Sequence, residues 1–194
     1  MIMVAYDGSS RDRLRTATSG AHARVDACFP GGLGDTAAYR RYLCGMHGLV
    51  AALEDALATA RLEGEWQRWC NPHRVTRLTD DLRDLGADVM PRGPALSITG
   101  AAEAVGAMYV VEGSALGATL LLRDAVALGW TADRGARFLH GHGGADAGKR
   151  WRAYVQGLEA ARFDAHEEKR MFEAAARTFA YAEHEFLRAT QRTD

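Results

Sequence analysis

Residues 36–61, TAAYRRYLCGMHGLVAALEDALATAR, are the stretch of the chain that decides its fold class. Their apolar residues recur at spacings of three and four, which places them on one stripe of a helix. The stripe contains Tyr39, Tyr42, Leu43, Met46, Leu49, Val50, Leu53 and Leu57. Asp35 or Thr36 can cap its start, and the stretch contains no proline. We therefore predict one long amphipathic helix from this cap to about Arg61.

The flanking sequence has the same helical character. Only four prolines occur, at positions 30, 72, 91 and 94, and no stretch alternates β-branched and polar residues over the length of a strand. The other expected helices cover residues 10–28, 64–71, 74–85, 97–128, 131–139, 146–163 and 166–188, with loops at 91–94 and 141–144. The pattern predicts an all-α fold, a single-domain bundle of about eight helices.

Length and composition limit the classes of protein that remain. The 194 residues correspond to one domain, and a hydrophobic share of 47% is enough to build a core. The formal net charge of -1 argues against a general nucleic-acid binder, which would carry a basic excess. We expect residues 1–194 to form one domain, with residues 1–9 as a flexible N-terminal arm.

The cysteines and the apolar runs point to a cytoplasmic protein. Cys28, Cys44 and Cys70 form no CxxC pair, so neither a disulfide framework nor a zinc knuckle follows from them. The first residues, MIMVAYDGSS, lack the basic region and the long apolar region of a secretion signal. The longest apolar run, around 115–122, is shorter than the ~20 residues of a membrane span. We therefore expect no membrane anchor.

The first candidate site lies on the helix expected over residues 10–28. Helical spacing puts His22 on the same inward face as Leu14 and Thr18, with Arg15 almost two turns before it and Asp26 one turn after it. Asp26 can accept a hydrogen bond from one ring nitrogen, as metal-bound histidines usually require. One histidine cannot close a zinc site but suffices as an axial ligand of heme iron. The alternative is a histidine at the edge of the core with an acidic partner.

The second candidate site lies within residues 108–120, MYVVEGSALGATL. Gly113 and Gly117 are one turn apart and Tyr109 is one turn earlier, while Ser114 and Ala115 are also small. Glycine costs about 1 kcal/mol in a helix relative to alanine, so this bare strip of backbone and an expected kink at Gly113–Ser114 need a reason. The strip would let a flat ligand approach the backbone. The alternative is a close crossing of two helices through small residues.

Taken together, the two segments resemble the heme oxygenase family, in particular its bacterial branch, which includes the enzymes associated with bacteriophytochromes. The first family pattern, L-R/K-x-x-T-x-x-x-H-x-x-x-D/E, is matched at Leu14, Arg15, Thr18, His22 and Asp26. The second, Y-x-x-E-G-S-x-L-G, is matched at Tyr109, Glu112, Gly113, Ser114, Leu116 and Gly117. Gly135 to Leu139 and the late aromatic helix around Phe179 and Tyr181 also look like this branch.

The resemblance implies a role for each matched residue. His22 would ligate heme iron on the proximal side, and Asp26 would orient its imidazole. Gly113, Ser114 and Gly117 would form the distal wall, where the backbone approaches bound O2 closely.

The same resemblance implies residues that seat the heme. Arg15 and Tyr181 would bind the propionates, and Tyr109 would contact the heme below the distal kink. Ala115 stands where some bacterial members carry Asn or Thr, so a hydrogen bond to distal water would be missing. Arg150 or Arg152 is a further candidate for the pocket rim.

The implied activity is that of a soluble heme oxygenase, for which heme is both substrate and cofactor. Heme, O2 and electrons would give biliverdin, CO and ferrous iron. No glycine-rich phosphate loop follows a strand, so the electrons would come from an external donor, a ferredoxin or an NAD(P)H-dependent reductase. A bacteriophytochrome is one acceptor that the resemblance suggests for the biliverdin.

Two other functions and three other histidines stay open at this point. A non-catalytic heme-binding or ligand-binding regulatory or interaction protein can share the fold, and Ala115 favours that alternative. An enzyme of the thiaminase-like type would need a cysteine nucleophile with acidic neighbours, which none of the three cysteines has. His47 is expected near the core and is a weaker candidate for heme ligation. His140 and His142 are expected in a solvated turn.

Overall fold

The computed structural model describes residues 8–60, 62 and 64–192. Within these residues the regular structure is entirely helical, and no strand occurs. The elements are α1 (Ser10–Asp26), α2 (Thr36–Ala60), the short 3-10 helix η1 (Gly64–Trp69), α3 (His73–Asp84), α4 (Ala101–Ala127), α5 (Arg137–Gly143), α6 (Ala147–Ala160) and α7 (Ala165–Gln191). The predicted all-α class is confirmed. Residues 1–7 of the expected arm lie outside the described residues, whereas Ser9 caps α1 by accepting from the Asp12 amide.

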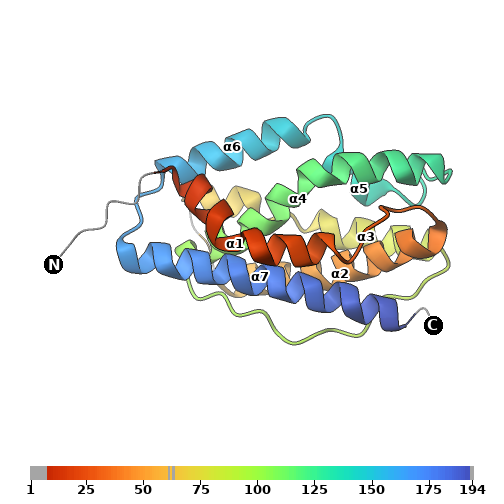
Figure 1. The fold of residues 1–194 in the computed structure, drawn as a ribbon, viewed down its shortest axis with the longest axis horizontal. Helices are drawn as coiled ribbons and strands as arrows, with labels where there is room; N and C mark the ends of the chain where they lie inside the picture. Colours follow the sequence, from red (N-terminus) through yellow and green to blue (C-terminus); the bar gives the residue numbers. More distant parts are fainter. Residues whose placement is uncertain (1–7, 61, 63, 193–194) are drawn as a thin grey trace.

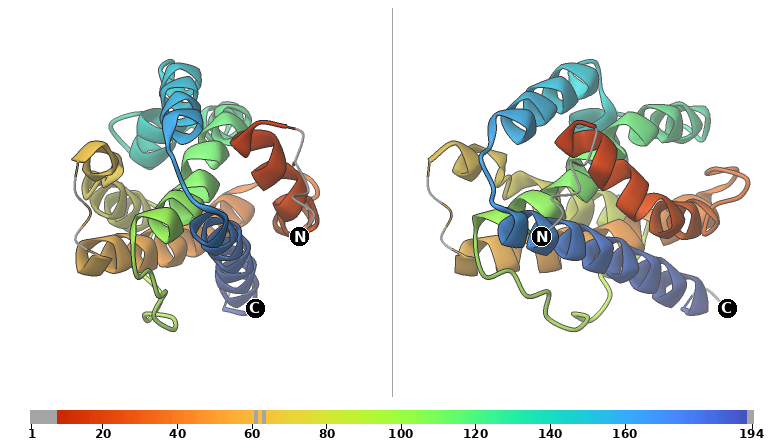
Figure 2. Two further views of the ribbon diagram at one scale, coloured as in Figure 1. Left: turned by 90° about the vertical axis from the view of Figure 1, so that its left-hand side faces the viewer. Right: turned by 60° about the vertical axis from the view of Figure 1, so that its left-hand side comes forward.

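The long helix α4 is the centre of the fold. It packs against α7, α5, α6 and α2, and α2 packs in turn against α7 and α3. Helix α1 lies along α7 and makes a smaller contact with α6 (Figures 1 and 2). Figure 1 also shows the segment of residues 85–100, which has no regular structure, running along the edge of the bundle. Helices α6 and α7 therefore pack directly on α4, and α1 packs on both of them.

Helix α4 is more apolar than the sequence analysis allowed. By length and composition alone Ala101–Ala127 could cross a membrane, with a mean hydropathy of 1.5 over its most apolar window. In the fold 56% of that window is buried inside the protein, as in the core helix of a globular domain. The helix is continuous through Gly113 and Gly117, and Figure 1 shows its axis changing direction partway along.

One pair of expectations is wrong. A helix was expected over 131–139 and a loop over 141–144, but residues 131–135 form a turn and α5 runs from Arg137 to Gly143. The buried Asp81 of α3 explains the shift, because its carboxylate accepts from the backbone amides of Arg137 (3.0 Å) and Phe138 (2.8 Å). These two bonds fix the start of α5 as a capping residue would. No local signal in the glycine-rich sequence reveals a cap that comes from another helix.

Candidate active site

Helix α1 presents His22 to solvent rather than to the core. Leu14 and Thr18 are buried against α7, but 59% of the His22 side chain is exposed. Its Nδ1 lies 3.0 Å from Asp26 Oδ2, one turn further along. The Phe179 ring of α7 meets the imidazole edge-on, with the ring centroids 5.5 Å apart. The sequence analysis expected an inward face, and the structure places His22 at the edge of that face.

The His22 ring is held so that its other nitrogen is available. The Nδ1 atom faces Asp26, and Nε2 has no hydrogen-bond partner within the described part of the chain. A carboxylate on one ring nitrogen fixes the tautomer in which the other carries the lone pair. This is the arrangement that an axial metal ligand needs.

Ion pairs and backbone bonds tie α1 to the helices beside it. Glu159 of α6 accepts from the amides of Ser10 (3.0 Å) and Arg11 (2.9 Å), which satisfies two free donors at the helix start. Arg24 pairs with Glu183 of α7 at 2.8 Å. These tethers position α1 although little of its surface is buried.

The middle of α4 carries an open apolar strip, which we call the glycine strip: Tyr109, Gly113, Leu116, Gly117 and Leu120. A Cβ atom on Gly117 would meet nothing within 4 Å, and one on Gly113 would meet only the Trp151 ring at 3.6 Å. Leu116 and Leu120 are 46% and 61% exposed, unusual for large apolar side chains. The strip is therefore covered by Trp151 of α6 at its Tyr109 end and offers bare backbone and apolar surface from Leu116 to Leu120.

Tyr109 connects the glycine strip to α1. Its ring packs against Trp151 of α6 at a centroid distance of 5.5 Å. Burial raises the pKa of the Tyr109 hydroxyl, the positive charges of Arg11 and Arg15 oppose that rise, and Asp12 adds to it. The charged residues in the first turns of α1 therefore act electrostatically on this hydroxyl. The sequence analysis selected Arg15 but missed Arg11, which is one turn earlier and equally exposed to an incoming anion.

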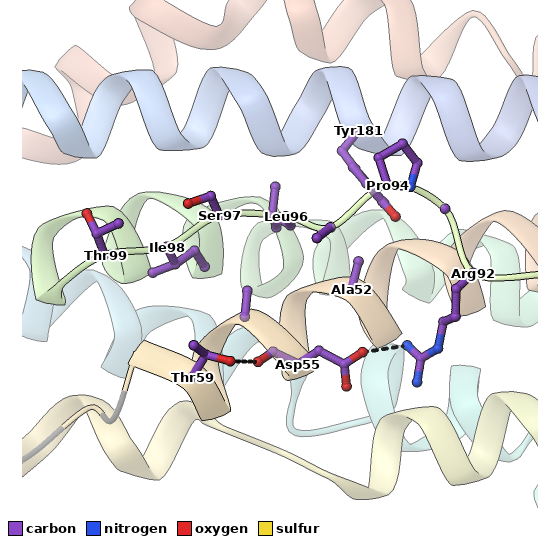
Figure 3. Close-up of a pocket in the computed structure, with 13 residues that line it drawn as sticks. Ala52, Asp55, Thr59, Arg92, Pro94, Leu96, Ser97, Ile98, Thr99 and Tyr181 are labelled. Atoms are coloured by element: carbon purple, nitrogen blue, oxygen red, sulfur yellow. Dashed lines mark hydrogen bonds and ion pairs between the residues drawn. The ribbon is translucent and has the colours of Figure 1, made fainter.

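Two of the predicted heme-contacting residues lie away from this region. Ala115 is 1% exposed and points to the face of α4 opposite Gly113 and Gly117. Tyr181 lies two residues after Phe179, which turns it to the other side of α7. Figure 3 shows Tyr181 beside Pro94, over a pocket that also contains the Asp55–Arg92 ion pair. The structure does not bring these two residues together with His22.

Behind the glycine strip lies a group that we call the buried charge cluster: Arg74, Glu112, His142 and Arg150. The Glu112 carboxylate, 1% exposed, pairs with Arg74 of α3 and accepts from Arg150 Nε of α6 at 2.9 Å. Arg150 also donates to His142 Nδ1 at 3.1 Å. Arg150 was a candidate for the pocket rim together with Arg152, and the structure places it behind α4 instead.

The expectation that His142 lies in a solvated turn is wrong. His142 is 2% exposed, belongs to α5, and stacks on Phe138 with a centroid distance of 5.0 Å. Burial lowers the pKa of the imidazole well below its usual value, Arg74 and Arg150 lower it further, and the Val111 carbonyl opposes the change. His47 is also buried, as expected, and its Nε2 lies 3.2 Å from the Thr79 hydroxyl. Neither histidine lies on α1, the helix that carries His22.

Comparisons with known proteins identify the family to which this fold belongs. The family model described as heme oxygenase matches residues 9–187. The heme oxygenase of Neisseria meningitidis, whose crystal structures hold NO and CO, is similar in structure with a TM-score of 0.73 and 26% sequence identity. That similarity covers 94% of this chain and 92% of the other. No curated protein sequence matches this chain. Since the family model spans nearly all of the sequence, the chain belongs to the heme oxygenase family.

Proposed function

We propose that this heme oxygenase binds its heme between α1 and α4, with His22 on the proximal side and the glycine strip on the distal side. The family and the structural match make the chain an enzyme that degrades heme to biliverdin. We propose further that CO and ferrous iron are the other products, and that residues 1–194 work as one domain. The observations that carry the binding site are an exposed histidine on α1 with a free Nε2 and, on α4, two glycines whose surroundings leave room for a ligand.

On the proximal side, His22 fits the group that it would hold. Its Nδ1 lies 3.0 Å from Asp26 Oδ2, so a proton held between these two atoms would leave the Nε2 lone pair for the iron. Phe179 limits rotation of the ring from the side of α7. Asp26 is a positioning residue in this arrangement, because it acts on the iron only through the imidazole.

On the distal side, the strip contributes space rather than a reactive side chain. Bound heme supplies both the iron that activates O2 and the porphyrin carbon that is oxidised. Gly113 and Gly117 would leave room for the porphyrin, and the exposed Leu116 and Leu120 would exclude water from it. No acidic or basic side chain belongs to the glycine strip, since Glu112 is turned into the buried charge cluster. The strip therefore provides no general acid or base of its own.

The propionates are best received where the strip meets α1. Arg15 remains in the proposed site, and the structure supports adding Arg11 and the Tyr109 hydroxyl, which has no hydrogen-bond partner in the described residues. Two guanidinium groups and one hydroxyl suit a pair of carboxylates. Tyr181 is left out of the site because it lies on the far side of α7.

The remaining parts of the reaction come from outside the chain. We propose O2 as the oxidant and a ferredoxin or an NAD(P)H-dependent reductase as the electron donor. A cytoplasmic location fits both donors, and a bacteriophytochrome is a plausible acceptor for the biliverdin. The exposed arginines of α1 would face such a donor at the heme edge.

The structure removes the reason for preferring the alternative, a non-catalytic heme-binding protein. It rested on Ala115, which was expected to remove a hydrogen bond to distal water. Ala115 is buried on the opposite face of α4, so its identity does not change the glycine strip.

The test is a hemin titration of the apoprotein followed by reduction in air, monitored by absorbance. We expect one equivalent of hemin to give a Soret band that decays to the broad red absorption of biliverdin. A stable Soret band would contradict oxygenase activity and leave a heme-binding protein. A titration without any Soret band would contradict the binding site itself.

A further inference from the structure

The buried charge cluster stands directly behind the distal part of the proposed site. Helices α3, α5 and α6 each contribute a side chain to it, and all of them converge on residues 112–114 of α4. Glu112 and Ser114 flank Gly113, which carries no side chain that could hold the helix in place. A group of buried charges at this point is expensive to form and calls for an explanation beyond filling space.

The hydrogen bonds of the cluster have a single possible direction. A guanidinium can only donate, so His142 Nδ1 must accept the bond from Arg150 Nη2 (3.1 Å). The neutral ring then carries its proton on Nε2, which lies 2.9 Å from Ser114 Oγ. Ser114 in turn donates to the Val111 carbonyl at 2.8 Å. The order of donation is Arg150 to His142 to Ser114 to the α4 backbone.

The charges around His142 keep the ring neutral. Arg74 from α3 and Arg150 from α6 face the ring region, and Glu112 from α4 is already shared between them. Protonating the imidazole would put a third positive charge beside one carboxylate. The ring therefore keeps its Nε2 proton for Ser114 across the neutral pH range.

We propose that His142 is a positioning residue for heme degradation: oriented by Arg150, it fixes the Ser114 hydroxyl and through it the α4 backbone beside Gly113. This inference rests on the proposed function, because it assigns a consequence to the position of the glycine strip. His142 does not itself touch the strip. Its influence passes through Ser114, the residue next to Gly113.

The first experiment examines the ring in the full apoprotein, without heme. Nitrogen-15 NMR of histidine-labelled protein, with His142→Gln to assign the signal, should show one neutral ring protonated on Nε2 from pH 5 to 8. Arg150→Met removes the donor to Nδ1, so the tautomers should mix. A wild-type ring protonated on Nδ1, or one that titrates near pH 6.5, would overturn the proposal.

The second experiment measures single-turnover heme decay. Ser114→Ala and His142→Phe should each slow the decay about tenfold, the usual effect of one lost hydrogen bond to a positioned group, and hemin affinity should change less than about threefold. Because His142 acts through Ser114, the double variant should be no slower than either single variant. Thr119→Ala is the matched control, since Thr119 Oγ1 also bonds α5, at the Gly143 carbonyl (3.0 Å).

Several outcomes separate this inference from the proposed function. Additive losses in the double variant, or an equal loss in Thr119→Ala, would overturn the positioning role. Melting curves identify a His142→Phe protein that fails to fold, in which case Ser114→Ala decides. If the wild-type protein leaves heme intact, the proposed function fails together with the catalytic part of this inference. The NMR experiment then still decides whether Arg150 sets the His142 tautomer.

Discussion

The two sides of the proposed heme site are built in opposite ways. On the α1 side the key group is exposed, and its partners are near in sequence: Asp26 is four residues from His22. On the α4 side the glycine strip has no functional side chain, and the residues that hold it are buried and distant in sequence. Arg74 is 38 residues from Glu112, and His142 is 28 residues from Ser114.

This difference separates the residues that would bind the iron from those that hold the distal helix in place. A solvent-facing imidazole can accept an incoming ligand without moving the core, so the proximal side needs only local geometry. The distal helix must stay in place although two glycines weaken it, and three neighbouring helices, α3, α5 and α6, hold it through one cluster of charges. Substitutions on the α1 side should therefore change chemistry with little change in stability, whereas those behind α4 should change stability as well as turnover.

The largest effect is expected for His22→Ala. Loss of the iron ligand should displace the Soret band and reduce turnover by about 100-fold or more, while the melting temperature stays within about 2 °C because the side chain is mostly exposed. Absorbance and thermal unfolding of the same samples measure both. His73→Ala, at an exposed histidine of α3, is the control. An unchanged Soret band would exclude His22 as the ligand.

Gly117→Leu tests the distal side without touching the buried charge cluster. The new side chain would enter open space in the apoprotein, so stability should hold or rise by about 0.5 kcal/mol from better helix propensity. The same side chain would occupy the volume above the ring and should reduce heme turnover at least about tenfold. Gly20→Leu, on the side of α1 away from His22, is the matched control because it too meets nothing within 4 Å. Equal turnover in both variants would show that the strip does not face heme.

The sequence analysis succeeded where the information was local. The periodicity of residues 36–61 predicted α2, whose start is capped by Asp35 through the Ala38 amide (2.7 Å). Spacing of four residues was enough to predict the contact between His22 and Asp26. Both features depend on one helix only.

The sequence analysis failed where residues distant in sequence determine the position of a side chain. His142 was assigned to a solvated turn because its glycine-rich neighbours suggested one, and nothing nearby reveals the Asp81 cap or the Arg150 partner. Tyr181 was grouped with the heme contacts although it lies about 200° from Phe179 around the helix, a separation that helical spacing alone could have shown. Glu112 was noted only as a matched position of the second family pattern. A single carboxylate in the apolar middle of α4 was the missed signal of a buried cluster.

Glu112→Gln should reveal the cost of the buried charge cluster. The substitution leaves Arg74 and Arg150 buried or half-buried without a counter-charge, and we expect a loss of about 3 kcal/mol in the free energy of unfolding. Glu183→Gln, which breaks the more exposed pair with Arg24, should lose less than about 1 kcal/mol. Urea unfolding of both variants compares the two losses in the free energy of unfolding. Similar losses would contradict the contrast between the two sides.

The smallest effect is expected at Glu54, whose carboxyl interacts electrostatically with Arg74 of the buried charge cluster. Burial raises the pKa of this carboxyl to about 7, Arg74 opposes the rise, and its Oε1 has no hydrogen-bond partner. A pKa raised in the folded state makes the protonated form the stabilising one. The contribution of Glu54 to stability should therefore be most favourable below about pH 4.5, fall as the pH rises to about 7, and stay level above it.

Glu54→Gln removes this penalty. After allowance for the partial exposure of the side chain, the variant should be more stable than wild type by about 1 kcal/mol at pH 8 and equal to it near pH 4.5. Thermal unfolding at the two pH values gives the difference, with Glu173→Gln at an exposed carboxylate of α7 as control. A gain that does not depend on pH would mean that packing, rather than the buried charge, is responsible. A gain confined to high pH would show that the half-buried charge of Glu54 is kept at a cost to stability.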